Sequence, residues 1–244
     1  MRNISLALAY DGTNYHGWQR QPGIVTVEQK VREALQKILD HETKLYAGAR
    51  TDSGVHAMDQ VVNFVTEKGI GLQNLSRGLN SLLPPDIRVM SARDADESFH
   101  ARYSALSKTY VYCILNDLSN SPFLARYVLH WPYSLDVGAM KEAVNCIIGE
   151  HDFSAFKKKD ELYKNPVREV KKARVTKRAE MIYIVLEATG FMRYMVRIIA
   201  GTLILVGQGK INCSGFKEIL ESRERERAGQ TLPPHGLFLK KITY

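Results

Sequence analysis

The chain has few cysteines and no long hydrophobic run. Its three cysteines, Cys113, Cys146 and Cys213, lie far apart along 244 residues, and none forms a C-x-x-C pair. This spacing argues against a zinc site or a disulfide framework, so we expect free buried thiols in the reducing cytoplasm. No stretch approaches the roughly 20 apolar residues that span a bilayer. The alternating segment 4–10 is too short for a signal peptide, so no membrane association is predicted.

The chain also lacks a phosphate loop, and it carries an excess of positive charge. Residues 207–210 do not have the G-x-x-x-x-G-K-[ST] spacing. Lysine and arginine number 34 against 26 acidic residues, a net charge of +8. A basic surface attracts polyanions such as tRNA, although charge alone does not separate RNA from DNA, from anionic lipid or from an inert surface. Two basic clusters are candidate RNA contacts, and half or more of their side chains are expected to be plain surface: Lys157–Lys159, and Lys171, Lys172, Arg174, Lys177 and Arg178.

The order of elements predicts an α+β protein in two halves, residues 1–105 and 106–244. In the first half, alternating apolar residues predict strands near 4–10 and 87–90, and an apolar run predicts a buried strand near 61–65. Apolar residues at helical spacing predict helices over 27–39, after the capping pair Thr26 and Gln29, and over 72–82.

The second half follows the same style. Strands are predicted near 110–115 and 237–244, and residues 167–176 and 182–188 read as a hairpin. Helices are predicted over 137–148 and over 191–206, the latter ending near Gly207, and Ser214 is a candidate cap for a short last helix. Each half is expected to contain a mixed, mainly antiparallel sheet.

The segment Gly48–Ala57 carries the strongest functional signal. Between two glycines, Gly48 and Gly54, it holds a carboxylate, an arginine, two hydroxyls and an imidazole, and a buried strand follows. Glycines allow a tight turn and a close approach to a ligand, so the loop suits the presentation of a reactive group. By composition alone, a polar turn whose Asp and Ser bond their own backbone explains it at least as well.

Six blocks in order along the chain resemble the tRNA pseudouridine synthase A family. The segment Gly48–Ala57 resembles that family's active-site motif G-R-T-D-x-G-V-H-A, in which the Asp is catalytic. The blocks run from residue 10 to the C-terminus: Tyr10–Gln21, Gly48–Ala57, Phe99–Tyr112, His151–Phe156, Gly190–Arg197 and Pro234–Leu239. The resemblance implies a pseudouridine synthase fold, with two ferredoxin-like or RRM-like α+β halves around a basic cleft.

The resemblance implies three catalytic residues. Asp52 is the candidate nucleophile, which attacks either ribose C1′ or uracil C6. Tyr110 is assigned to stacking on the target base, and its hydroxyl to proton transfer at C5. A nucleic acid raises the pKa of a nearby carboxyl, and a cation opposes this effect. Arg197 matches the cation that the family supplies from a later helix, so it is expected to pair with Asp52.

Four further residues are candidates for substrate binding. If the segment is extended, the side chains of Arg50 and Asp52 lie on the same face. Arg50 could then bind a phosphate, or it could insert into the base stack and fill the gap left when the target uridine flips out. Arg193 lies four residues before Arg197, on the same predicted helix face, and could instead face phosphate or solvent. Arg20 belongs to a segment that mixes aromatic and basic residues, as RNA-binding segments do. His56 could touch RNA, although a role in holding the loop is favoured.

The resemblance implies action on tRNA positions 38, 39 and 40 of the anticodon stem-loop by a homodimer. Uridine and pseudouridine are isomers, so the reaction requires no redox cofactor or energy source, and no metal is expected.

The departures from the family motif are small: Ala49 stands between Gly48 and Arg50, Ser53 replaces a frequent Ala, and residues 58–60 replace a usual Gly-Gln pairing. Three alternatives remain open: a pseudouridine synthase acting on another RNA such as rRNA, a glycosylase, and a catalytically silent RNA-binding module.

Overall fold

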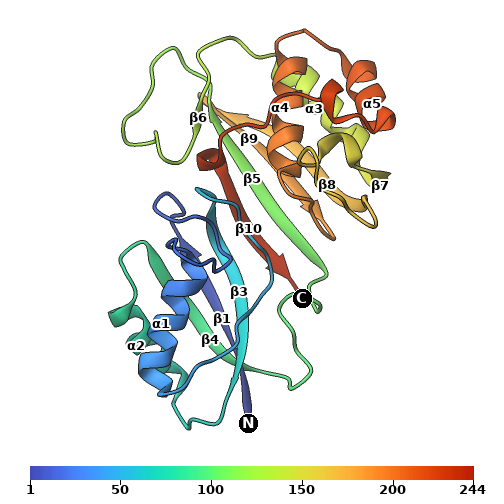
Figure 1. The fold of residues 1–244 in the computed structure, drawn as a ribbon. Coiled ribbons are helices and arrows are strands. Elements are labelled where there is room, and N and C mark those ends of the chain that lie inside the picture. The colour runs from blue at the N-terminus through green and yellow to red at the C-terminus, as the bar shows by residue number, and fades with distance from the viewer. The chain divides into compact units, whose positions relative to one another are not determined.

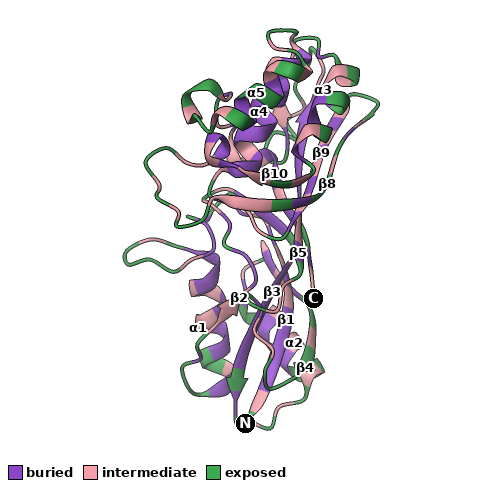
Figure 2. Cartoon of the chain, turned by 90° about the vertical axis from the view of Figure 1, so that its right-hand side faces the viewer, coloured by how far each residue is buried: buried purple, intermediate pink, exposed green.

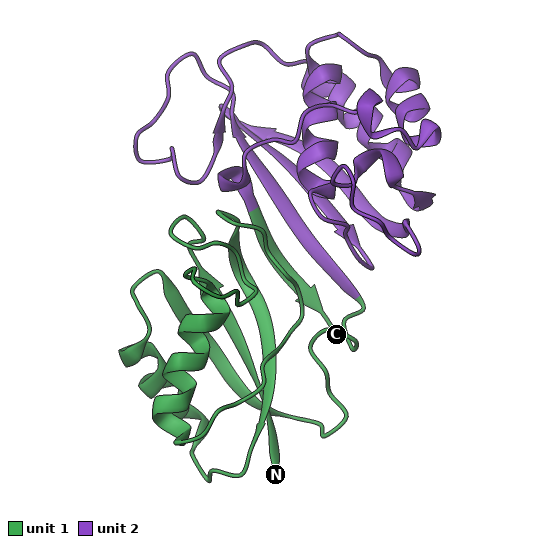
Figure 3. Cartoon of the chain, viewed as in Figure 1, with its two compact units in different colours: residues 1–106, 238–244 green, residues 107–237 purple.

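The computed structural model describes residues 1–244, which form two compact units (Figure 3). The first contains residues 1–106 and 238–244, and the second contains residues 107–237. The two contiguous halves expected from sequence therefore need one correction, because the last strand belongs to the first unit. Its Phe238 and Leu239 pair in parallel with His56 and Ala57, and such a long-range pairing leaves no local signal in the sequence.

The first unit is a mixed sheet with two helices (Figure 1). The sheet order is β4-β1-β3-β10, with antiparallel β4-β1 and β1-β3 pairs, a parallel β3-β10 pair, and β2 antiparallel to β3. Its elements are β1 (Arg2–Tyr10), α1 (Val27–Leu39), β2 (Tyr46–Ala47), β3 (His56–Thr66), α2 (Leu72–Leu82), β4 (Ile87–Ala95) and β10 (Leu237–Thr243).

Alternating apolar residues build the core of this unit. Ile4, Leu6 and Leu8 of β1 are fully buried, and the purple segments of Figure 2 mark such positions. The helix α1 begins after Thr26, whose Oγ1 accepts a hydrogen bond from the Gln29 N–H at 3.4 Å. This bond satisfies one of the donors that a helix start leaves without a partner.

The second unit is a four-stranded antiparallel sheet, order β5-β9-β8-β7, with helices on one face (Figure 1). The short strand β6 pairs in parallel with β5. Its elements are β5 (Ser107–Leu115), β6 (Leu129–His130), α3 (Val137–Val144), β7 (Gly149–Asp152), β8 (Val167–Arg178), β9 (Met181–Ala188), α4 (Met195–Gly207) and α5 (Cys213–Ser222). The α+β class and the mixed sheets expected from the sequence are confirmed.

Three helix boundaries differ from the sequence prediction. The helix α4 begins at Met195 and not at Phe191, because Tyr194 has a left-handed backbone with φ of 67°. Asn212, and not Ser214, caps α5, its Oδ1 accepting from the Gly215 N–H at 2.8 Å. The helix α3 ends at Val144, where a tighter three-residue turn follows.

The cysteines are only partly as expected. Cys113 is buried, but Cys146 and Cys213 are partly exposed, and their Sγ atoms lie 3.4 Å apart. Burial raises the pKa of the Cys146 thiol to about 11, and the neighbouring Cys213 adds to the effect. Distance along the chain therefore does not imply distance in the fold.

None of the helices has the length and apolar character that crossing a membrane requires.

Candidate active site

The segment that carries Asp52 continues along the edge of β3. The Gly48 N–H donates to the Val61 carbonyl at 2.8 Å. The amide side chain of Gln60 accepts from the Ala49 N–H at 3.1 Å and donates to the Ala49 carbonyl at 2.7 Å. Gln60 is fully buried, so this pair of hydrogen bonds, which resembles the pairing between two strands, holds the backbone of the segment just before Asp52.

The turn that follows presents Asp52. The Val55 N–H donates to the Asp52 carbonyl at 3.1 Å, and Gly54 takes a positive φ of 75°. The Ser53 hydroxyl and the Gly54 N–H both donate to the Tyr15 carbonyl, at 3.3 and 3.2 Å. Asp52 is partly exposed. Its backbone is thus fixed on both sides while its side chain keeps access to solvent.

Side chains alternate along this segment. Thr51 is only 7% exposed, and its Oγ1 lies 2.8 Å from the Tyr10 hydroxyl. Arg50, on one side of Thr51, is exposed, and Asp52, on the other, is partly exposed. Burial raises the pKa of Tyr10, which keeps that hydroxyl protonated. The buried pair fixes the middle of the segment, between the more exposed residues Arg50 and Asp52.

The segment Tyr15–Gln21, which mixes aromatic and basic residues, packs in the first unit and contacts the Asp52 loop. Tyr15 and Trp18 are 5% and 2% exposed. The Trp18 ring stacks on Tyr10 with centroids 6.1 Å apart, and the Tyr15 hydroxyl donates to Asp86 at 2.5 Å. These two aromatics are therefore core residues of the first unit and not an RNA-stacking surface. Arg20 is exposed.

His56 is buried, at 1% exposure. Its Nδ1 lies 3.1 Å from both the Gly12 N–H and an Asp11 carboxylate oxygen. An unprotonated Nδ1 accepts from Gly12, whereas a protonated one donates to Asp11. The ring also stacks on Phe238, with centroids 4.6 Å apart. These contacts favour the loop-holding role over contact with RNA.

In the second unit, Tyr110 lies on β5 opposite Leu186 of β9. Its ring meets Phe191 edge to face, with centroids 5.0 Å apart and planes at 80°. Tyr112, two residues further on, is fully buried, and its hydroxyl donates to the Pro233 carbonyl at 2.8 Å. The packing on Phe191 fixes the orientation of the Tyr110 ring.

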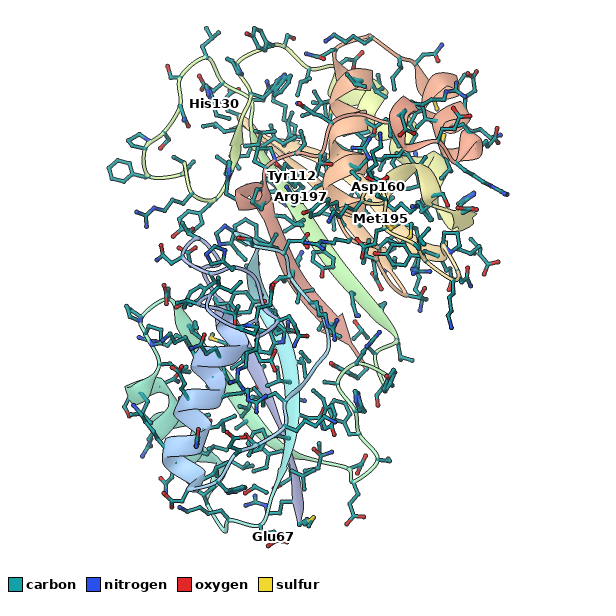
Figure 4. The ribbon with its side chains drawn as sticks, in the orientation of Figure 1. Glu67, Tyr112, His130, Asp160, Met195 and Arg197 are labelled. Atoms are coloured by element: carbon teal, nitrogen blue, oxygen red, sulfur yellow. The ribbon has the colours of Figure 1, made fainter.

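Arg197 is the third residue of α4, and it is partly exposed. Its Nε donates to the Leu232 carbonyl at 2.6 Å. Its guanidinium carbon lies 4.7 Å from the centre of the Tyr194 ring, within cation–π range. Figure 4 labels Arg197 beside Tyr112 in this unit. Burial raises the pKa of Tyr112, and the charge of Arg197 partly opposes this.

The expectation that Arg193 shares a helix face with Arg197 is wrong. Arg193 precedes α4 and lies in a turn. Its N–H donates to the Tyr163 hydroxyl at 2.9 Å, and its carbonyl accepts from the Lys158 N–H at 3.0 Å. Its guanidinium carbon lies 5.2 Å from the Tyr194 ring. The side chain is nevertheless exposed, and both arginines contact one aromatic ring.

Sequence reasoning missed the residues that hold the site. Gln60, Asp11 and Tyr194 were assigned no such role. Gln60 had a usable signal, because a glutamine beside the apolar residues of a buried strand requires hydrogen-bond partners. Tyr194 had no such signal, since only the folded backbone reveals its positive φ.

No cluster of three or more His, Cys, Asp or Glu side chains able to hold a metal ion occurs in the structure.

Comparisons with known proteins give a consistent result. The family model described as tRNA pseudouridine synthase matches residues 6–104 and 143–244. A tRNA pseudouridine synthase A of Thermoanaerobacter sp. (strain X514) is 46% identical, and one of Caldicellulosiruptor bescii is 44% identical, each over the full length of both chains. One of Bacillus pumilus is 41% identical over 99% of this chain and 98% of its own.

Among solved structures, an H/ACA RNP bound to a substrate RNA containing 2'-deoxyuridine covers 82% of this chain and 44% of its own. Its identity is 15% and its TM-score 0.35, a likeness too weak to add to the sequence matches. Those matches span most of both units and include the segments of Asp52 and Arg197. The chain therefore belongs to the tRNA pseudouridine synthase family.

Proposed function

We propose that this protein isomerises uridine to pseudouridine in tRNA, at positions 38, 39 and 40 of the anticodon stem-loop. The observation that carries the proposal is Asp52, a partly exposed carboxylate on a loop that is rigidly fixed on both sides. Family membership supports the reaction. The positions within tRNA rest on the resemblance of the motif segments alone.

Asp52 is the proposed nucleophile. Attack at ribose C1′ displaces N1, and the C5–C1′ bond that forms after the base turns then displaces the Asp52 carboxylate. Attack at uracil C6 instead forms an adduct in which the N1–C1′ bond breaks, the base turns and C5 joins C1′, after which the Asp52–C6 bond breaks and the carboxylate leaves. The C5 proton then leaves and N1 takes up a proton, so reactant and product have the same atoms. A rigid backbone around Asp52 supports such a step, because a nucleophile works best when its position is fixed before the reaction.

Tyr110 and Arg197 are the proposed partners of Asp52 in the reaction. The ring of Tyr110 would stack on the target base, and its hydroxyl would assist the proton transfer at C5. Arg197 would supply the positive charge that keeps the reacting carboxylate ionised. The restrained positions of both side chains, on Phe191 and on the Leu232 carbonyl, support these roles.

Exposed cations are the proposed contacts to the RNA backbone. Arg20, Arg50 and Arg193 are all exposed, and a guanidinium group binds phosphate through a planar pair of donors. The net charge of +8 supports the same role. His56 is assigned to holding the loop, since it is buried.

A cytoplasmic homodimer is part of the proposal, and sedimentation with and without tRNA would test the dimer.

Carbodiimide mapping of pseudouridine in tRNA and rRNA treated with the pure protein tests the function. New pseudouridine at positions 38–40 is the expected result, and none should form with Asp52→Asn. Modification of rRNA alone would instead favour the other synthase, and release of free uracil would favour a glycosylase. Binding without any modification would favour the silent RNA-binding module.

A further inference from the structure

The irregular segment Ala228–Pro233, which we call the strap, crosses α4 in very close contact. A Cβ on Gly201 of α4 would lie 2.0 Å from the Gln230 carbonyl oxygen. A Cβ on Gly229 would lie 2.6 Å from the backbone of Gly201 and of Thr202. Only glycine permits backbone to touch backbone at both places.

The Thr202 hydroxyl joins the strap to the helix. It accepts from the Gly229 N–H at 2.8 Å and donates to the Ile198 carbonyl at 2.9 Å. Thr202 is fully buried. A buried N–H that loses its acceptor carries a desolvation penalty, so removal of the hydroxyl would drive Gly229 away from α4.

The same strap holds Arg197. The Leu232 carbonyl accepts from Arg197 Nε at 2.6 Å, and the Leu232 N–H donates to the Arg197 carbonyl at 3.4 Å. Leu232 is 1% exposed. A bond at Nε restrains the guanidinium plane itself, in a side chain that otherwise has many rotamers.

The strap is also fixed at both ends. Arg225 donates to the Ala228 carbonyl at 3.3 Å and to the Thr231 hydroxyl at 3.2 Å. Tyr112, two residues after Tyr110 on β5, donates to the Pro233 carbonyl at 2.8 Å. The strap therefore links α4 with the strand of the second proposed catalytic residue, within one unit.

We propose that the strap is a positioning element for Arg197 and that Thr202 is the positioning residue that fastens it. This inference rests on the proposed function of Arg197. Thr202 touches no substrate, and it acts by setting where the Leu232 carbonyl places the guanidinium group.

Three variants test the role of Thr202. Thr202→Val keeps the shape and removes the hydroxyl, so kcat should fall about tenfold or more, as expected for a misplaced catalytic group, while KM for tRNA changes less than about twofold. Thr202→Ser keeps the hydroxyl and should restore most of kcat. Thr43→Val is the matched control, because Thr43 is also buried but its Oγ1 has no hydrogen-bond partner, and its kinetics should match those of wild type.

A second background separates positioning from general loosening. Arg197→Lys lacks the Nε–H, so adding Thr202→Val to it should reduce kcat by less than about twofold. The acid limb of the pH–rate profile should shift in the same direction in Thr202→Val as in Arg197→Lys. Equal losses from Thr202→Val in both backgrounds, or a Thr202→Ser variant as slow as Thr202→Val, would overturn the inference. Full activity of Arg197→Ala would instead refute the proposed role of Arg197 itself.

Discussion

The carbonyl oxygen of Thr51 accepts a hydrogen bond from the backbone N–H of Trp18 at 3.1 Å. This bond ties the residue before Asp52 to a segment much earlier in the chain. Gly17, the residue before Trp18, has a φ of 86°, and a Cβ at this position would lie 2.6 Å from the same Thr51 carbonyl oxygen. The position of the Asp52 loop therefore depends on the absence of a side chain at residue 17.

Gly17→Ala should lower both stability and turnover. Gly23 offers a matched control, since its φ is 76° but a Cβ added there would meet nothing within 4 Å. Both variants carry the cost of a left-handed alanine, about 1–2 kcal/mol, and only Gly17→Ala adds a clash with the loop. Urea unfolding and tritium release from C5-labelled tRNA would measure the two effects. Equal losses in both variants would show that the contact with Thr51 has no consequence.

Asp52→Ala should abolish pseudouridine formation and leave tRNA binding largely intact, because one side chain supplies the nucleophile but not the phosphate contacts. Tritium release reports the chemistry, and filter binding reports the affinity. Asp59→Asn, on the following strand, is the control and should turn over normally. Appreciable turnover by Asp52→Ala would remove Asp52 from the nucleophile role.

Tyr110→Phe should separate stacking from proton transfer. The ring that packs on Phe191 is retained, so tRNA affinity should persist, while the single-turnover rate should fall by about 10²-fold, the usual size of a general acid–base contribution. Tyr183→Phe on β9 provides a control for the loss of a hydroxyl from this sheet. A near-wild-type rate in Tyr110→Phe would leave stacking as the only role of the ring.

Charge reversal at exposed basic residues of β8 should weaken tRNA binding more than it slows the bound complex. Arg174, Lys177 and Arg178 are exposed, whereas Lys159 pairs with Glu226 at 3.1 Å and Lys157 donates to the Glu161 carbonyl at 2.7 Å. The effect of reversal at the three β8 residues should therefore exceed that of reversal at 157–159.

Titrations at several salt concentrations would measure this difference. For each cation–phosphate pair that a variant no longer forms, the log–log slope of affinity against salt should fall by about one unit. Unchanged affinity and slope in the β8 variant would mean that the RNA binds elsewhere, with Arg20 and Arg50 as the next residues to reverse.

His235 should make the fold less stable at acidic pH. Burial lowers its pKa from 6.5, and the charge of Arg197 lowers it further, against a hydrogen bond with the backbone of Val128. The unfolded chain therefore binds a proton that the folded chain does not, so stability falls as the pH drops through 6.5 toward the folded pKa. His235→Gln should flatten this slope in urea midpoints measured between pH 5 and pH 7. In NMR titrations, Arg197→Ala should raise the pKa of His235, and an unchanged value would contradict the proximity of the two charges.

Local pattern determined much of the fold. The helix predicted over 72–82 is α2 as observed, and the helix after Thr26 covers Val27–Leu39 as expected. The hairpin at 167–188 also forms, as β8 and β9. These elements succeed because periodic burial and capping act between residues near one another in the chain.

The sequence by itself determined the family, through motif segments whose order and residue types resemble those of that family, and it predicts Asp52, Tyr110 and Arg197 as the catalytic residues. Only the tertiary structure decided that Trp18 and His56 are buried supports, that β10 joins the first unit, and that the strap holds Arg197. The physical reason is distance along the chain: hydrogen bonds and backbone contacts between remote segments, such as Gly229 with Thr202, leave no periodic trace in the sequence that makes them.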